Sequence, residues 1–165
     1  MGVDENVALM KRWFDDVWNQ GRMATVHELL AHDAVGFGQA EHGMEIRGPA
    51  EYERFAERLR GAFPDIKVKV EDAFGSGDGV VVRWSAVMTH LGGHLGVAAT
   101  NREVRVTGMA IVRIVNGKIV EGWDNWDQLA LMRQIGVITE DGQAQVKLSA
   151  KPAARASSGE SVGLN

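Results

Sequence analysis

The stretch "REVRVTGMAIVRIVNGKIVEGWDNWDQLALMRQIG" (residues 102–136) decides the fold, because it contains two strands, a hairpin turn and a helix in succession. Along 102–115 and again along 118–126, hydrophobic residues alternate with polar or small ones, the pattern of strands with one buried face. The pair "NG" at 116–117 is a strong hairpin signal. The stretch therefore predicts two long antiparallel strands followed by a short amphipathic helix.

Upstream of this stretch the same alternation continues. The segments "IKVKVEDAF" (66–74) and "VVVRWSAVMTH" (80–90) have the period of strands, and "GSGDG" (75–79) between them has the composition of a turn. A Gly-rich connection, "LGGHLGVAATN" (91–101), leads to the next strand. We expect an antiparallel meander of four strands.

The N-terminal part of the chain has helical periodicity instead. Apolar residues recur at helical spacing along 5–20 and 23–31, and "GPAEYERFAERLRGAFPDI" (48–66) is the clearest helix, with proline near its start and just past its end. The intervening "HDAVGFGQ" (32–39) is interpreted as a loop with a short strand. Helices segregated from a single antiparallel sheet are typical of α+β architecture.

Composition excludes several classes of function. The chain has 165 residues, a net charge of −4 and no cysteine, so no basic surface for nucleic acid, no disulfide and no thiolate metal site is expected. No histidine pair has the spacing of metal ligands, and we expect neither metal nor cofactor. No signal peptide or membrane segment is visible, so a cytoplasmic location is expected. Residues 1–141 are predicted to form one domain, and 142–165 a flexible tail.

Alternation also predicts which side chains face the helices. On 80–90 the more apolar face carries Val80, Val82, Trp84, Ala86, Met88 and His90, and on 102–115 the inner face carries Val104, Val106, Gly108, Ala110, Val112 and Ile114. On the last strand Val120, Gly122, Asp124 and Trp126 are expected to face inward, although a bulge would exchange the faces. The opposite face of 102–115, with Met109 and Ile111, suits a dimer contact, so a homodimer is expected.

Asp124 is the main candidate for a functional residue. It lies between two tryptophans and, on the predicted face, meets Trp84, Met88, Ala110 and Trp126. Loss of hydration in such a place raises the pKa of a carboxyl group by roughly 1–3 units, which allows proton exchange near neutral pH. The alternative is that Asp124 caps the helix that follows. Asp127 fits that role better, because it directly precedes "QLALMRQIG".

Several segments together carry a family resemblance. "LMKRWFDDVWNQGRMATVHELLAHDAV", "AFPDIKVKVEDAFGSGDGVVVRW", "THLGGHLGVAATNREV" and "NGKIVEGWDNWDQLALMRQIG" resemble a SnoaL-like polyketide cyclase domain of the nuclear transport factor 2-like superfamily. The resemblance covers about residues 5–136 and implies an α+β cone-shaped barrel, in which N-terminal helices pack on a curved antiparallel sheet.

The resemblance also implies a reaction. In SnoaL-type cyclases a single aspartate on the last strand acts as acid and base in an intramolecular aldol ring closure, without metal or cofactor. Asp124 matches this aspartate, and His90 matches a histidine that is frequent in the family. The chain departs from the pattern at Ala110, where a second polar residue is often found.

Two other branches of the superfamily fit less well. The positions that match the functional groups of ketosteroid isomerase are Phe14, Gly38 and Ala110, none of which can ionise. The Arg-x-Asp of limonene-type epoxide hydrolases is replaced by "RWS" (83–85) or "WSA" (84–86), which contain no carboxylate.

The predicted site therefore has two catalytic candidates, Asp124 and His90, inside an apolar cavity that takes a small hydrophobic molecule. The residues expected to bind that molecule are Phe14, Phe37, Trp84, Met88, Ala110, Gly122 and Trp126. Cyclisation of a polyketide is the favoured reaction. Non-catalytic binding, epoxide-hydrolase-like hydrolysis and dehydration stay open as alternatives.

Overall fold

The structure, a computed structural model, describes residues 2–39, 44–139 and 141–144. Most of the predicted tail, residues 145–165, lies outside the described residues. The helices are α1 (Val3–Trp13), the π-helical turn η1 (Phe14–Asn19), α2 (Ala24–Leu29), α3 (Gly48–Ala62) and α4 (Gln128–Gln134). The strands are β1 (Leu30–Phe37), β2 (Glu45–Arg47), β3 (Lys67–Ser76), β4 (Gly79–Thr89), β5 (Glu103–Val115) and β6 (Lys118–Trp126).

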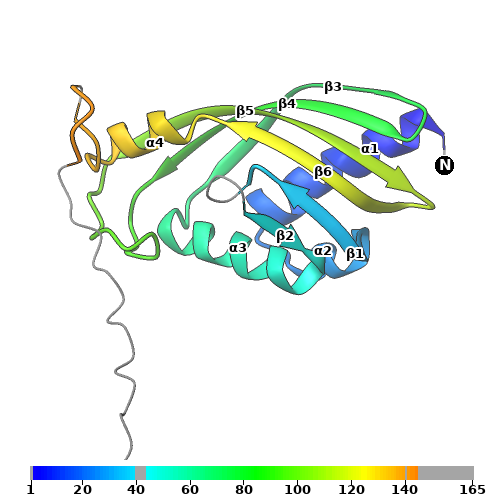
Figure 1. The fold of residues 1–165 in the computed structure, drawn as a ribbon, viewed down its shortest axis with the longest axis horizontal. Coiled ribbons are helices and arrows are strands. Elements are labelled where there is room, and N and C mark those ends of the chain that lie inside the picture. The colour runs from blue at the N-terminus through cyan, green and yellow to red at the C-terminus, as the bar shows by residue number, and fades with distance from the viewer. Residues whose placement is uncertain (1, 40–43, 140, 145–165) are drawn as a thin grey trace, which may run out of the picture.

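All six strands form one open sheet in the order β2-β1-β6-β5-β4-β3. The predicted meander is confirmed as β3 to β6, and Figure 1 shows the sheet arched over α1, α2 and α3, which confirms the predicted α+β fold. Sequence reasoning missed β2 and the full length of β1. β1 pairs with β6 in parallel, so the sheet is mixed. Parallel pairing of distant segments has no turn signal in the sequence.

The predicted inner faces of the two longest strands are confirmed. Every second residue of β4 and of β5 is buried, beginning at Val80 and Val104. In β6 the prediction is correct for Gly122, Asp124 and Trp126, but wrong for Val120. A bulge between the pairs Arg113↔Glu121 and Ile114↔Ile119 places Ile119 in the core instead.

A buried carboxylate joins the first helical segment to α2. Asp16 accepts hydrogen bonds from Thr25 Oγ1 at 2.8 Å and from Arg22 at 2.9 Å, and Arg12 lies 3.1 Å away. Burial acts to raise the pKa of Asp16, but the Thr25 hydrogen bond and the two guanidinium groups lower it below its ordinary value. These contacts hold η1, which carries Phe14 and Trp18, against α2.

No helix in the described ranges is both long and apolar enough to cross a lipid bilayer.

The indole of Trp84 lies across β5 above Gly108. A Cβ on Gly108 would stand 2.3 Å from Trp84 Cζ2 and 2.8 Å from the Cβ of Trp126. Only glycine fits at this position, because any side chain would displace the indole. Gly122 also lies on the inner face, yet a Cβ there would meet nothing closer than Gln39 Nε2 at 3.9 Å.

We predict that Gly108→Ala destabilises the protein by about 1–3 kcal/mol, because the added methyl group overpacks the space taken by the Trp84 indole. Gly122→Ala is the matched control and is expected to be neutral or slightly stabilising. Urea denaturation measures both free energies of unfolding, and near-ultraviolet circular dichroism reports the tryptophan environment. Equal effects of the two substitutions would contradict the described packing.

Candidate functional site

Asp124 lies on the inner face of β6 near the C-terminal end of the strand, opposite Ala110 on β5. Asp124 is not the cap of the following helix. Asp127 is, because its side chain accepts a hydrogen bond from the backbone N–H of Ala130 at 2.8 Å at the start of α4. On the other side of β6, the end of β1 comes very close to the strand. A Cβ on Gly38, which has a φ of +80°, would stand 1.9 Å from the carbonyl oxygen of Asp124.

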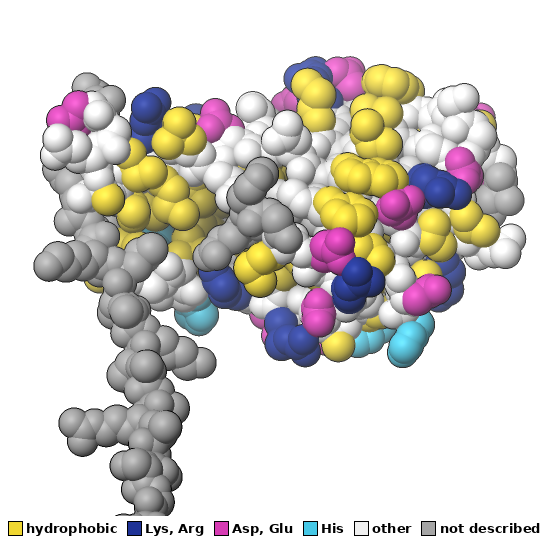
Figure 2. Space-filling view, viewed as in Figure 1, with side chains coloured by type: hydrophobic (Ala, Val, Ile, Leu, Met, Phe, Trp, Pro, Cys, Tyr) yellow, Lys and Arg dark blue, Asp and Glu magenta, His cyan; other side chains and the backbone are white. Residues whose placement is uncertain are grey.

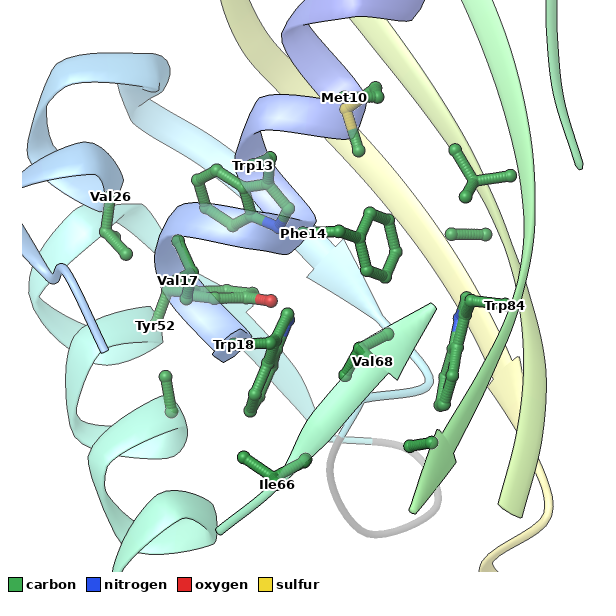
Figure 3. Packing of buried hydrophobic residues seen from close by; sticks show 14 of the residues in the cluster. Met10, Trp13, Phe14, Val17, Trp18, Val26, Tyr52, Ile66, Val68 and Trp84 are labelled. Carbon is green, nitrogen blue, oxygen red and sulfur yellow. The ribbon is translucent and has the colours of Figure 1, made fainter. Parts of the chain in front are cut away.

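Asp124 borders two narrow hollows between the helices and the sheet. The first has a cavity volume of about 40 Å³ and lies between η1, α3 and the inner face of β4. The second, of about 50 Å³, lies toward α1 and β1. Each has room for a few water molecules. Figure 3 shows the aromatic walls: Phe14, Trp18 and Tyr52 project from the helices toward Trp84 on the sheet.

The Asp124 carboxyl group is poorly solvated. Its Oδ1 is buried and has no hydrogen-bond partner among the described residues. Because the charged form loses hydration there, burial raises the pKa of Asp124 from an ordinary value of 3.8 to about 7. A carboxyl group with this pKa exchanges protons near neutral pH, which is the property required of a general acid and base.

Gln39 is a polar neighbour that sequence reasoning missed. Its side chain lies over Gly36 and reaches both hollows that contain Asp124. Its carbonyl oxygen accepts a hydrogen bond from Trp126 Nε1 at 3.3 Å, while its side-chain Oε1 is buried with no partner in the described part of the chain. The parallel pairing of β1 with β6 brings Gln39 to the hollows that contain Asp124, and no local pattern in the sequence predicts this pairing.

Tyr52 on α3 is the second missed neighbour. Burial, and then the negative charge of Asp124, raise the pKa of the Tyr52 phenol, while hydrogen bonds with Trp13 and Trp18 act in the opposite direction. Tyr52 therefore stays a neutral phenol at physiological pH. The signal in the sequence was available, since Tyr52 is the chain's single tyrosine and lies on the apolar face of its helix with Phe55.

The structure brings most of the predicted binding residues together around Asp124. Trp84, Met88 and Trp126 line the first hollow, Ala110 and Gly122 line the second, and Phe14 lines both. Phe37 lies elsewhere. It stacks on Trp123 with ring centroids 5.8 Å apart, at the rim of an outer groove.

His90 is buried but does not line either hollow. Its Nδ1 accepts a hydrogen bond from the backbone N–H of Thr100 at 3.3 Å and lies 3.1 Å from Thr100 Oγ1. Its ring packs on Phe63, with ring centroids 5.4 Å apart. Burial lowers the pKa of His90, so the ring is neutral. These contacts close the loop 91–101 at its base.

An outer groove of about 570 Å³ also reaches Asp124. It is bordered by the end of β1 and by the segment from Asp124 to Leu129. Trp126 and Asp124 each border both this groove and the first hollow. Within the described ranges, no three His, Cys, Asp or Glu side chains are grouped in a way that would hold a metal ion.

Comparisons with known proteins agree on one family. The model of the SnoaL-like polyketide cyclase family matches residues 8–135. The aklanonic acid methyl ester cyclase DauD of Streptomyces sp. (strain C5) is 30% identical over 136 residues, which cover 81% of this chain and 83% of DauD. The corresponding enzyme DnrD of Streptomyces peucetius is 29% identical, over 81% of this chain and 92% of its own.

Solved structures with the same fold include IdmH from Streptomyces antibioticus, assigned as a polyketide cyclase. Its TM-score is 0.69 at 30% identity, and the match covers 80% of this chain and 99% of IdmH. A protein from Jannaschia sp. CCS1, assigned as SnoaL-like, superimposes with a TM-score of 0.75 over 83% of this chain and 95% of its own. At 24% identity this second match supports the fold alone.

The raised pKa of Asp124 makes a prediction about stability. As pH rises from 3.8 toward 7, the unfolded chain ionises this carboxyl group while the folded protein keeps it protonated, so folding stability falls across that window and levels off above it. Asp124→Asn removes the effect. The free energy of unfolding of the variant relative to wild type should therefore increase between pH 4 and pH 8, by up to about 4 kcal/mol.

Chemical denaturation at a series of pH values measures this difference. Asp33→Asn, which removes an exposed aspartate from β1, is the matched control and should show no such dependence. A relative stability of Asp124→Asn that stays constant from pH 4 to pH 8 would mean that Asp124 is hydrated.

Proposed function

Because the chain belongs to the SnoaL-like polyketide cyclase family, we propose that it closes a ring in a polyketide by intramolecular aldol condensation, with Asp124 as the general acid and base. The observation that carries the proposal is the unpaired, buried Oδ1 of Asp124, whose pKa of about 7 lets the group take and return a proton.

The reaction needs one proton carrier. Ionised Asp124 takes a proton from the acidic carbon of the substrate, and the electron pair of that C–H bond forms an enolate. The enolate carbon then bonds to a carbonyl carbon in the same molecule. The oxygen of that carbonyl becomes an alkoxide and takes the proton back from Asp124. Holding the two carbons in contact lowers the barrier by up to about 7–11 kcal/mol in the best intramolecular cases.

The size of the hollows sets a condition on binding. Volumes of about 40 and 50 Å³ hold a few waters, not a polyketide. The outer groove of about 570 Å³ is in the range of small-molecule sites. We therefore propose that the bulk of the substrate lies in the outer groove, and that Trp126 moves so that the reactive edge reaches Asp124.

Non-catalytic binding is the second candidate function, and the same apolar walls favour it. A binder needs the hollow and the groove but not a proton carrier. The two functions differ in what Asp124→Asn does, because loss of the carboxyl group stops proton transfer but leaves the apolar walls in place.

We predict that the protein cyclises aklanonic acid methyl ester, the compound named for two of its relatives, or a shorter polyketide of the same type. Asp124→Asn should lower kcat by roughly 10²–10⁴. The product is an isomer of the substrate, so chromatography with mass detection follows the reaction. In wild type, kcat should rise with pH through about 7 as Asp124 becomes ionised.

Asp33→Asn serves as the control for this experiment, since Asp33 is exposed on β1 and lies outside the hollows and the outer groove. Turnover by Asp124→Asn at the wild-type rate would rule out the acid–base role. Binding without turnover by wild type would favour the second candidate function.

We also propose that two copies of the chain pair through the outer face of the sheet. Strand register places Phe74, Val81, Ile111 and Trp123 in one row across β3, β4, β5 and β6. The side chains of Phe74, Ile111 and Trp123 are 63%, 52% and 41% exposed. Because they lie in one row, they form a contiguous apolar patch, which often marks an interaction site, whereas single scattered apolar residues do not. Figure 2 shows hydrophobic side chains running across the strands on the face in view.

Ile111→Glu tests the pairing, because it places a charge in the middle of the apolar row. Light scattering during size-exclusion chromatography should give a dimer for wild type and a monomer for this variant. Arg105→Glu, a charge change on the same face of β5 but outside the row, should leave the dimer intact. A wild-type monomer at micromolar concentration would contradict the proposal.

A further inference from the structure

Three unsatisfied polar atoms gather at the first hollow. In the described residues, five buried side-chain atoms have no hydrogen-bond partner: Asn6 Oδ1, Gln39 Oε1, Trp84 Nε1, His90 Nε2 and Asp124 Oδ1. Three of the five belong to residues that line the first hollow, namely Gln39, Trp84 and Asp124. Folded proteins pair nearly all of their buried polar groups. Three unpaired groups around one hollow therefore need partners there, which water supplies in the free protein and a bound polar ligand can replace.

Among these three atoms, Trp84 Nε1 is the only donor. Gln39 Oε1 accepts hydrogen bonds, and Asp124 Oδ1 accepts them when ionised. The Trp126 indole already donates to the backbone carbonyl of Gln39 at 3.3 Å. The Tyr52 phenol oxygen accepts from the indoles of Trp13 and Trp18, because an indole N–H can only donate, so the Tyr52 O–H is a second donor in the wall of the same hollow.

The Trp84 ring lies close to β6, and both Trp84 and Asp124 line the first hollow. Trp84 pairs with Gly108 and Gly108 pairs with Trp126, so the three residues lie in one row across β4, β5 and β6. The ring atom Cε2, which is bonded to Nε1, would lie 2.6 Å from a Cβ on Gly108. The same Cβ position lies 2.8 Å from the Cβ of Trp126, so the indole reaches across β5 to β6, where Asp124 is two residues from Trp126.

We propose that Trp84 is a second catalytic residue, whose Nε1–H donates to the substrate oxygen that becomes negative when Asp124 removes the proton. The proposal rests on the proposed function. In this step the C–H bond breaks, an O–H bond forms on Asp124, and the electron pair moves onto the carbonyl oxygen that faces Trp84. A preorganised donor in a dry site favours the charged oxygen over the neutral carbonyl, and so lowers the barrier.

The same three groups define a substrate class. A hydrogen-bond donor, a proton acceptor and a side-chain amide match the edge of an enolisable 1,3-dicarbonyl. In the diketo form one carbonyl oxygen faces Trp84, the acidic carbon faces Asp124, and the second carbonyl oxygen accepts from the Gln39 amide, whose O and N exchange places when the amide turns over. A purely hydrocarbon ligand would leave all three groups unpaired and would bind weakly.

Binding of benzoylacetone, a simple aromatic 1,3-dicarbonyl, tests the role of Trp84 without turnover. The Asp124→Asn protein mimics the state in which Asp124 holds the proton, and the ultraviolet absorbance of the probe reports how much of it is enolate. Titration with pH should show that this protein binds the enolate more tightly than the neutral form. Adding Trp84→Phe, which keeps an aromatic ring but removes the N–H, should reduce that preference at least tenfold.

Two further variants separate the hydrogen bond from packing. Trp126→Phe removes an indole whose N–H already has a partner, and is expected to weaken both forms of the probe equally. Trp84→His restores a ring N–H and should recover part of the preference for enolate. Thermal melting confirms that each variant is folded.

The outcomes distinguish this inference from the proposed function. Preference for the enolate that depends on Trp84 supports the inference even if wild type turns over no polyketide, in which case only the aldol proposal fails. An unchanged preference in Trp84→Phe overturns the inference even if cyclisation is observed. Failure of the Asp124→Asn protein to bind benzoylacetone at millimolar concentration also overturns it, because the proposed donor and acceptors would then recognise no 1,3-dicarbonyl.

Discussion

Burial of one carboxyl oxygen is the constraint around which the rest of the site is arranged. Asp124 Oδ1 is kept out of water by the aromatic residues of η1, α3 and β4, and none of the described residues gives it a hydrogen bond. Because the charged carboxylate loses hydration there, the pKa of Asp124 is raised. The protein is therefore less stable at neutral pH than it would be with an apolar residue at this place, as expected where function and stability conflict.

Glycine at two positions makes the arrangement possible. Gly108 lets the Trp84 indole lie across β5, and Gly38 lets the end of β1 approach the backbone of Asp124. The sequence predicted an apolar cavity around Asp124. At Gly108 the structure places the Trp84 indole on the inner face of the sheet instead of open space. The result is a narrow hollow lined by oriented polar atoms, and not a large empty pocket.

The candidate histidine and the candidate aspartate lie in different surroundings. His90 packs on Phe63 and bonds to Thr100, so its contacts hold the base of the loop 91–101. Asp124 instead lines both hollows, and burial of its Oδ1 raises its pKa to about 7. Both residues were predicted to face inward, and each has one buried atom without a partner, His90 Nε2 and Asp124 Oδ1. Contact with the hollows distinguishes the two residues, because His90 lines neither of them.

The sequence by itself determined the meander, the clearest helix and the orientation of Asp124, because side-chain alternation and turn residues are local signals. It also favoured Asp127 as the helix cap. Only the tertiary structure decided that β1 pairs in parallel with β6, which brings Gln39 to the site, and that a bulge turns Ile119 inward in place of Val120. The first depends on contacts between segments far apart in the chain, and the second on a bulge beside the hairpin turn. Side-chain alternation encodes neither of them.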